Sequence, residues 1–155
     1  MGTEIERKFL VKDGAWQASA SPGVPILQGY ICTGPPAAVR VRIAGDTATV
    51  NLKRSTLGIT REEFEYVIPP DDAAEMLGHL CEGHIIQKRR HTVAFNGSTW
   101  EVDVFEGANE GLVVAEIELE AEDQPFDNPP WLGDEVSGDP RYLNTSLSLR
   151  PYTEW

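Results

Sequence analysis

Residues 3–11 read TEIERKFLV, and the order of charged and apolar residues in this stretch decides the fold. Successive side chains of a β-strand point to opposite faces. Glu4, Glu6 and Lys8 therefore share one face of the strand, and the other face is largely apolar. A half-buried strand usually pairs its apolar face with neutral or mixed polar residues. A face made of two carboxylates and an ammonium therefore requires a special environment.

The same alternation recurs along the chain. Charged residues stand two positions apart within otherwise apolar segments, in six blocks that each keep one sign or nearly so. After the opening stretch, the other five blocks are Arg40 and Arg42, Glu63 and Glu65, Lys88 and Arg90, Glu101 and Asp103, and Glu116 and Glu118; Lys53 is a single charged position on a further strand. Like charges side by side repel each other on an open face. We therefore favour a closed sheet whose charged faces meet in one interior over a set of ordinary solvated faces.

Local patterns indicate a mainly β domain with few helices. Eight segments have strand character and are joined by short turns, as in an antiparallel meander or a barrel: 3–11, 26–33, 37–43, 47–54, 61–68, 85–95, 98–105 and 113–121. A helix is predicted over 72–82, with Asp72 and Glu75 as a capping box. Residues 15–21 are predicted as a short helix, residues 146–149 as a short helix or a strand, and the Pro-rich segment from Gln124 as irregular. The apolar strand faces would look outward and be covered by the 72–82 helix and the C-terminal segment.

Length and charge restrict the class of protein. A chain of 155 residues is sufficient for a single domain over residues 1–155. The net charge of −12 argues against a nucleic-acid or anionic-membrane partner. Eleven of the 13 Lys and Arg residues nevertheless lie in residues 1–92, so a local anion site is compatible with the acidic total. The N-terminus has no signal-peptide core, and we expect a cytoplasmic protein.

The two signs of charge together indicate the ligand. Clustered carboxylates without a cation repel each other and take up protons, and clustered Lys and Arg need a counter-charge. A polyphosphate bound with a divalent cation satisfies both groups. Carboxylate oxygens suit Mg²⁺ or Mn²⁺, which also bridge phosphate oxygens, and Arg and Lys side chains neutralise the phosphate chain.

The ordered set of these motifs resembles a known family. The motifs are E-x-E-x-K at 4–8, QGY at 28–30, R-x-R at 40–42, Leu52-Lys53, E-x-E at 63–65 and the late E-x-E at 116–118. They resemble the CYTH domain of the triphosphate tunnel metalloenzyme superfamily, most of all the short bacterial inorganic triphosphatases, from residue 3 to about residue 149. The resemblance implies an eight-stranded antiparallel closed β-barrel, a tunnel with a charged interior, that holds a triphosphate with Mg²⁺ or Mn²⁺.

The resemblance also implies roles for individual residues. The metal ligands would be Glu4, Glu6, Glu116 and Glu118, with Asp103 beside them. The substrate-binding side chains would be Lys8, Arg40, Arg42, Lys53, Lys88 and Arg90. Tyr30 would act with Lys8 in catalysis, and Glu63 and Glu65 would be additional tunnel carboxylates. One position departs from many relatives, because Arg141-Tyr142 is followed by Leu143 where they have a lysine. A basic contact to the terminal phosphate would then be missing.

Three functions are compatible with the sequence. The first is metal-dependent hydrolysis of inorganic triphosphate to diphosphate and phosphate. The second is a thiamine or nucleoside triphosphatase or a class IV adenylyl cyclase, each of which needs a pocket for the organic group. The third is a non-catalytic polyphosphate-binding module, against which the complete set of carboxylates argues. A small-molecule triphosphate is the expected partner in each case, and a homodimer is compatible with the chain.

Overall fold

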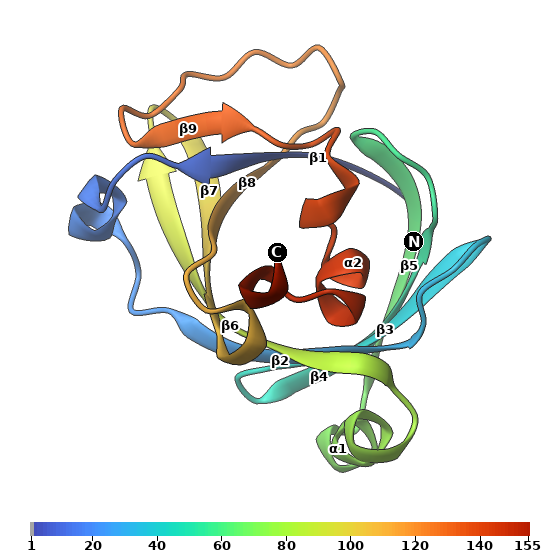
Figure 1. Cartoon of the computed structure of the whole chain (residues 1–155). Helices are drawn as coiled ribbons and strands as arrows, with labels where there is room; N and C mark the ends of the chain where they lie inside the picture. The colour runs from blue at the N-terminus through green and yellow to red at the C-terminus, as the bar shows by residue number, and fades with distance from the viewer. Residues whose placement is uncertain (1) are drawn as a thin grey trace.

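The computed structural model describes residues 2–155 and consists mainly of one antiparallel sheet that closes on itself (Figure 1). Eight strands follow one another around the ring in the order β1-β8-β7-β6-β2-β3-β4-β5, and pairing of β5 with β1 closes it. The strands are β1 (Gly2–Val11), β2 (Val24–Cys32), β3 (Ala37–Ala44), β4 (Thr47–Arg54), β5 (Thr60–Ile68), β6 (Glu82–Phe95), β7 (Ser98–Glu106) and β8 (Val113–Glu118). The predicted eight-stranded closed barrel is confirmed.

A ninth strand, β9 (Leu132–Glu135), lies in the Pro-rich segment that was predicted to be irregular. It pairs with β1 through Phe9 and Val11, on the edge that β5 occupies only from Gly2 to Ile5. Its residues, LGDE, have little strand propensity, so the pairing arises from the free edge of β1. Gly133 permits this contact, because a Cβ there would lie 2.9 Å from the backbone oxygen of Leu10.

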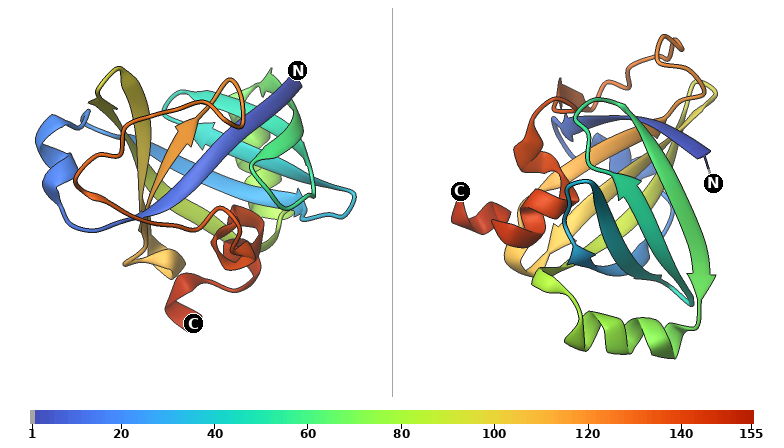
Figure 2. Two further views of the ribbon diagram at one scale, coloured as in Figure 1. Left: turned by 90° about the horizontal axis from the view of Figure 1, so that it is seen from above. Right: turned by 90° about the vertical axis from the view of Figure 1, so that its right-hand side faces the viewer.

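The helix α1 (Pro70–His79) lies on the outside of the barrel over β3 (Figure 2). The helix lies slightly earlier in the sequence than the predicted range of residues 72–82, and the predicted capping box does not form. The N-cap is Pro69, and it has no side-chain capping hydrogen bond. Pro70 takes the first helical position, which suits its fixed backbone angle and its lack of an N–H. The helix ends at His79, since β6 begins at Glu82.

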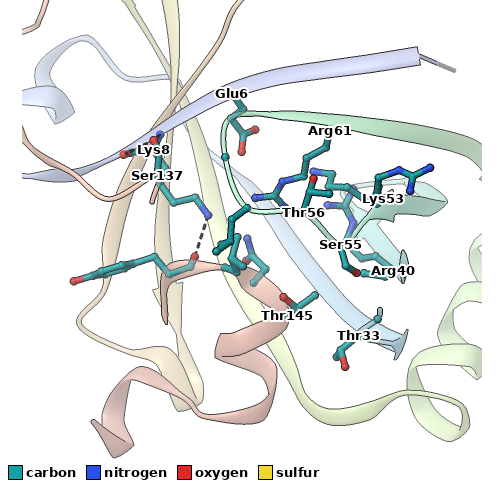
Figure 3. Close-up of a pocket in the computed structure, with 18 of the residues that line it drawn as sticks. Glu6, Lys8, Thr33, Arg40, Lys53, Ser55, Thr56, Arg61, Ser137 and Thr145 are labelled. Atoms are coloured by element: carbon teal, nitrogen blue, oxygen red, sulfur yellow. Dashed lines mark hydrogen bonds between the residues drawn. The ribbon is translucent and has the colours of Figure 1, made fainter. Parts of the chain in front are cut away.

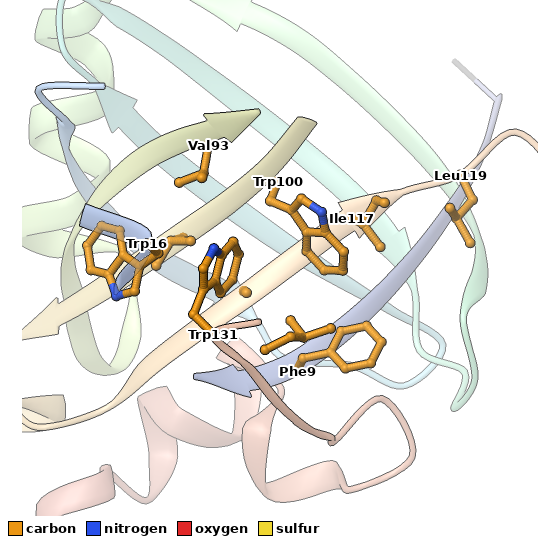
Figure 4. Close-up of a cluster of buried hydrophobic side chains, with 10 residues drawn as sticks. Phe9, Trp16, Val93, Trp100, Ile117, Leu119 and Trp131 are labelled. Atoms are coloured by element: carbon orange, nitrogen blue, oxygen red, sulfur yellow. The ribbon is translucent and has the colours of Figure 1, made fainter. Parts of the chain in front are cut away.

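Apolar side chains cover the outside of the barrel, as predicted, but the C-terminal helix that was expected to take part packs against inner-face residues instead. The short helix η1 (Ala15–Ser19) and the segment before β9 cover one side. Trp100, Trp131 and Phe9 form its centre, with the Trp100 and Trp131 rings packed edge to face at 5.9 Å (Figure 4). On the opposite side, Ala73 of α1 packs against Val41 and Ala48. These clusters keep the apolar faces of the strands out of water and leave the inner faces for polar groups.

The C-terminal helix α2 (Asn144–Leu149) lies across one end of the barrel (Figures 1 and 2). This confirms a helix at 146–149. Its Leu147 is fully buried against Ile86, Phe105 and Val114, which continue the inner faces of β6, β7 and β8. The interior is therefore charged along part of its length and apolar where α2 packs. Three 3-10 turns, η2 (Gly107–Asn109), η3 (Pro140–Tyr142) and η4 (Tyr152–Glu154), complete the chain. Within residues 2–155 no helix is long and apolar enough to cross a membrane.

Candidate active site

The strand register brings the charged blocks onto one inner surface. On β1 and β8, Glu6 is opposite Glu118 and Lys8 is opposite Glu116. Because directly paired residues point to the same face, the inner set continues around the ring from one strand pair to the next. Further inner pairs are Glu101 with Glu116, Arg90 with Asp103, Tyr30 with Arg40, Arg40 with Asn51, Lys53 with Glu63, and Glu4 with Arg61.

A cavity of about 260 Å³ opens between these inner faces and the C-terminal segment (Figure 3). Five of the predicted site residues line it: Glu6, Lys8, Tyr30, Arg40 and Lys53. The loop 55–58 and the segment 136–145 form its rim. The other predicted residues do not line it: Glu4, Arg42, Glu63, Glu65, Lys88, Arg90, Asp103, Glu116 and Glu118. They lie deeper in the barrel or along the same inner faces, as the register requires.

Behind the cavity, Asp103 is fully buried between two cations. It accepts a hydrogen bond from Lys88 Nζ at 2.7 Å and two from Arg90, at 2.7 Å from Nε and 2.8 Å from Nη2. Burial lowers the pKa of Lys88 to about 7, although Asp103 opposes this change. The two bases hold the pKa of Asp103 below its usual value against the effect of its burial. Both oxygens of this carboxylate are thus occupied by the protein's own cations.

Arg40 and Arg42 are held at different depths of the same wall. Arg42 donates from Nε to Gln28 Oε1 at 2.9 Å, and burial, with the neighbouring Arg40 and Arg90, lowers its pKa to about 10. Arg40 Nη2 lies 3.3 Å from Glu65, but its buried Nε has no hydrogen-bond partner among residues 2–155. An unsatisfied buried donor is costly. An anion in the cavity would supply the missing acceptor.

Glu6 and Glu116 form a buried pair of carboxyl groups. Burial raises the pKa of Glu6 well above 4.5, and the adjacent Glu116, which shares a hydrogen bond with it, raises it further. The pKa of Glu116 is instead lowered, because Lys8 and the hydrogen bond from Glu6 outweigh its own burial. The raised pKa of Glu6 reflects the cost of a second negative charge this close to Glu116. A hard divalent ion would relieve that repulsion, so the two carboxyl groups are a suitable donor set for it.

The remaining carboxylates are neutralised by the protein or exposed. Glu4 forms an ion pair with Lys53 at 2.6 Å. Asn51 donates to both Glu63 and Glu65, at 2.5 and 3.2 Å. Glu118 is exposed, and partial burial together with Glu4 raises its pKa. Among residues 2–155 there is no preformed group of three or more acidic, His or Cys side chains that could hold a metal. Without a cation, these carboxylates pair with Lys, Arg and Asn instead of converging.

Lys8 and Tyr30 line the same cavity, as their proposed cooperation requires. The Lys8 ammonium donates to the backbone oxygen of Tyr142 at 3.0 Å (Figure 3). The C-terminal segment thus contacts the opening strand directly. Leu143, which replaces the late lysine of many relatives, also lines the cavity.

Sequence reasoning missed Arg61, whose side chain lines the cavity beside Lys53 (Figure 3). The sequence does indicate this position, because Arg61 stands two residues before Glu63 and therefore shares the face of Glu63. Asn51 also lines the cavity, and its position two residues before Lys53 places it on the same face. Ser137 and Tyr142 could not have been found, since they enter the cavity from an irregular segment that has no periodicity.

Comparisons with known proteins agree with this geometry. The family model of the CYTH domain matches residues 2–152. The chain belongs to the CYTH domain family. An inorganic triphosphatase of Acetivibrio thermocellus is 49% identical over 152 residues, which cover 98% of this chain and 97% of that protein. An inorganic triphosphatase of Nitrosomonas europaea is 40% identical, covering 95% and 97%. A crystal structure of an inorganic triphosphatase superposes with a TM-score of 0.66 at 36% identity, covering 96% of each chain.

The Glu6–Glu116 pair predicts how the stability of this CYTH domain depends on pH. Because the pKa of Glu6 is above 4.5 in the folded state, the folded protein binds a proton that the unfolded chain releases. The contribution of Glu6 to stability is therefore present below pH 4.5 and decreases as pH rises through the folded-state pKa. Glu6→Gln has no carboxyl group at this position and does not lose stability in this way. The melting temperature of the metal-free variant should therefore exceed that of metal-free wild type, by a margin that grows as pH rises.

Thermal unfolding of both proteins in EDTA, from pH 4 to 8, measures the difference. Glu122→Gln is the matched control, because Glu122 is exposed and lies outside the cavity. Parallel curves for wild type and Glu6→Gln would show that no buried proton is shared at this position.

Proposed function

We propose that this chain hydrolyses inorganic triphosphate to diphosphate and phosphate in a reaction that depends on Mg²⁺ or Mn²⁺. The observation that carries the proposal is the two-sided composition of the cavity. Lys8, Arg40, Lys53 and Arg61 face it as basic side chains, and Glu6, whose pKa is raised by burial and by the adjacent Glu116, lines it as well. The two inorganic triphosphatases at 49% and 40% identity support the same activity.

The known relatives and the lining of the cavity favour an inorganic substrate over one with an organic group. Both curated relatives are inorganic triphosphatases. The cavity is lined by Lys and Arg side chains, and its rim is rich in hydroxyl groups, including Thr33, Ser55 and Thr56, all of which suit a phosphate chain. Inorganic triphosphate is therefore preferred to thiamine triphosphate, ATP or GTP.

The divalent cation would be held mainly by Glu6 and Glu116, with Glu4 and Glu118 on the same inner faces. When bound, such a cation neutralises phosphate charge and makes the phosphorus more open to attack. We assign Asp103 a positioning role, because both its oxygens already hold Lys88 and Arg90. It would hold these two bases in place behind the cavity, where their charges favour a bound anion.

The cationic side chains would bind and align the phosphate chain for in-line attack by water. Arg40 offers its free Nε, and Arg61 lines the cavity without an ion pair to a carboxylate of residues 2–155 within 4 Å. Two roles are open for Lys8. It can contact a phosphate from the position in which its Nζ now donates to Tyr142. Alternatively, after losing its proton, it can activate water together with Tyr30.

A substrate panel tests the proposed activity. Phosphate release should be fastest with inorganic triphosphate and slower with thiamine triphosphate, ATP and GTP. EDTA should abolish the release, and added Mg²⁺ or Mn²⁺ should restore it. Equal rates with and without EDTA would show that the reaction does not depend on a metal ion. Cyclic AMP formation from ATP would indicate the cyclase, and tight binding of triphosphate without turnover would indicate a binding module.

Steady-state kinetics tests whether Arg61 binds the phosphate chain. Arg61→Ala should raise KM at least about tenfold with little change in kcat, because a hydrogen bond to a charged group contributes roughly 1.5–3 kcal/mol. Arg89→Ala is the control, since Arg89 is an exposed arginine that does not line the cavity. An unchanged KM in Arg61→Ala would show that Arg61 does not bind the phosphate chain.

The pH profile of kcat decides the role of Lys8. If Lys8 acts as a base, kcat should rise with pH along an alkaline limb that disappears in Lys8→Arg, and Tyr30→Phe should be slower. If Lys8→Arg keeps the wild-type kcat and the same limb, Lys8 is a phosphate contact only.

A further inference from the structure

The outer face of the β4–β5 hairpin exposes an unusual amount of apolar surface. Among residues 2–155, ten large apolar side chains are well exposed, and five of them lie between residues 52 and 67. Three of the five are on the outer face of the barrel: Leu52, Phe64 and Tyr66, at 37%, 38% and 58% exposure. Exposed apolar residues scattered singly are normal, whereas a contiguous group marks an interaction site.

The strand register shows that this group is contiguous. Val39 is opposite Leu52, and Leu52 is opposite Phe64, so one apolar row crosses β3, β4 and β5. In the next row Val50 is opposite Tyr66. We call these five residues the outer ladder. It is distinct from the cavity, because alternate residues of the same strands, such as Lys53 and Glu63, point inward.

The boundaries of the outer ladder are defined on two sides. At one end α1 covers the sheet, where Ala73 packs on Val41 and Ala48. At the other end Arg54 and Glu62 form an exposed ion pair across β4 and β5. The surface thus consists of two apolar rows and one row with a positive and a negative group, and it carries no net charge.

We propose that the outer ladder binds a second copy of this chain. A two-fold axis that runs parallel to the strands, between β4 and β5, places β4 of one copy over β5 of the other. Leu52 then faces Phe64 of the second copy, Val50 faces Tyr66, and Arg54 faces Glu62. Apolar side chains therefore face apolar side chains, and opposite charges face each other. Such self-complementarity is the requirement for an isologous dimer.

The overall charge also favours a second copy at this place. Each chain carries a net charge of −12, so two copies repel each other over most of their surfaces. A neutral face with an apolar centre allows approach with little repulsion. Its polar rim supplies two symmetry-related ion pairs, which fix the orientation.

Sedimentation velocity over a range of protein concentrations tests the proposal. Wild type should reach twice the monomer mass of 17.1 kDa. Phe64→Glu should raise the dimer dissociation constant at least about a hundredfold, because it places an unpaired charge in each half of the interface. Leu27→Glu is the matched control. Leu27 is 41% exposed on the outer face of β2, outside the outer ladder, and this variant should dimerise as wild type does.

The triphosphatase activity is expected to be unchanged in both variants, since neither residue lines the cavity. A wild type that stays monomeric up to high micromolar concentration would overturn the proposal. So would a Phe64→Glu protein that dimerises like wild type. Neither result bears on the proposed hydrolysis.

A charge exchange keeps the test independent of any folding defect in Phe64→Glu. Arg54→Glu alone and Glu62→Arg alone should each dimerise more weakly than wild type, because like charges then face each other across the axis. An equimolar mixture should form heterodimers, since every facing pair again has opposite signs. A mixture as weak as the separate variants would contradict the two-fold arrangement.

Discussion

Repulsion between like charges that face one interior is the constraint on which this structure depends. The barrel places eight carboxylates and more than six bases on its inner surface, where low polarity strengthens every electrostatic interaction. The chain accommodates them by three means. Cations lie against carboxylates, as with Lys88 and Arg90 on Asp103. The pKa of Glu6 is raised by burial and by the adjacent Glu116, which favours its neutral form. Asn51 donates to Glu63 and Glu65.

The same arrangement prepares the site for a ligand that carries both charges. A divalent cation can relieve the repulsion between Glu6 and Glu116, and a phosphate chain can accept from Arg40 and Arg61. In the metal-free protein the carboxyl pair is one point of electrostatic strain, and the buried cations Arg42 and Lys88, whose pKa values are lowered, are another. The neighbours of the carboxyl pair are already ordered by pairing. Such preorganisation reduces the reorganisation that substrate binding requires.

The inner and outer faces could be predicted from sequence because they rest on the two-residue period of a strand, which is a local property. This is why the E-x-E, R-x-R and K-x-R blocks were assigned to one interior. Which partners these residues take depends on strand register, and so the pairing of Asp103 with both Lys88 and Arg90 was not predicted. β9 was missed because its pairing is set by an edge of β1 that lies more than 120 residues away.

The closed end of the barrel is the other feature that local patterns did not predict. Residues 146–149 allowed either a helix or a strand, and only packing of Leu147 on Ile86 and Phe105 decides for a helix inside the barrel. The contact of Lys8 with Tyr142 has the same origin. Through this contact the C-terminal segment helps to position a residue of the opening strand.

The central claim is that the charged interior binds a divalent cation and a triphosphate together. Crystals grown with Mn²⁺ and a triphosphate analogue with nitrogen in place of the bridging oxygens test it directly, because anomalous scattering locates the manganese independently of the protein. The account predicts a manganese peak against Glu6 and Glu116, with the phosphate chain contacting Arg40 and Arg61. Manganese bound only on the outer surface, or a phosphate chain outside the barrel, would contradict it.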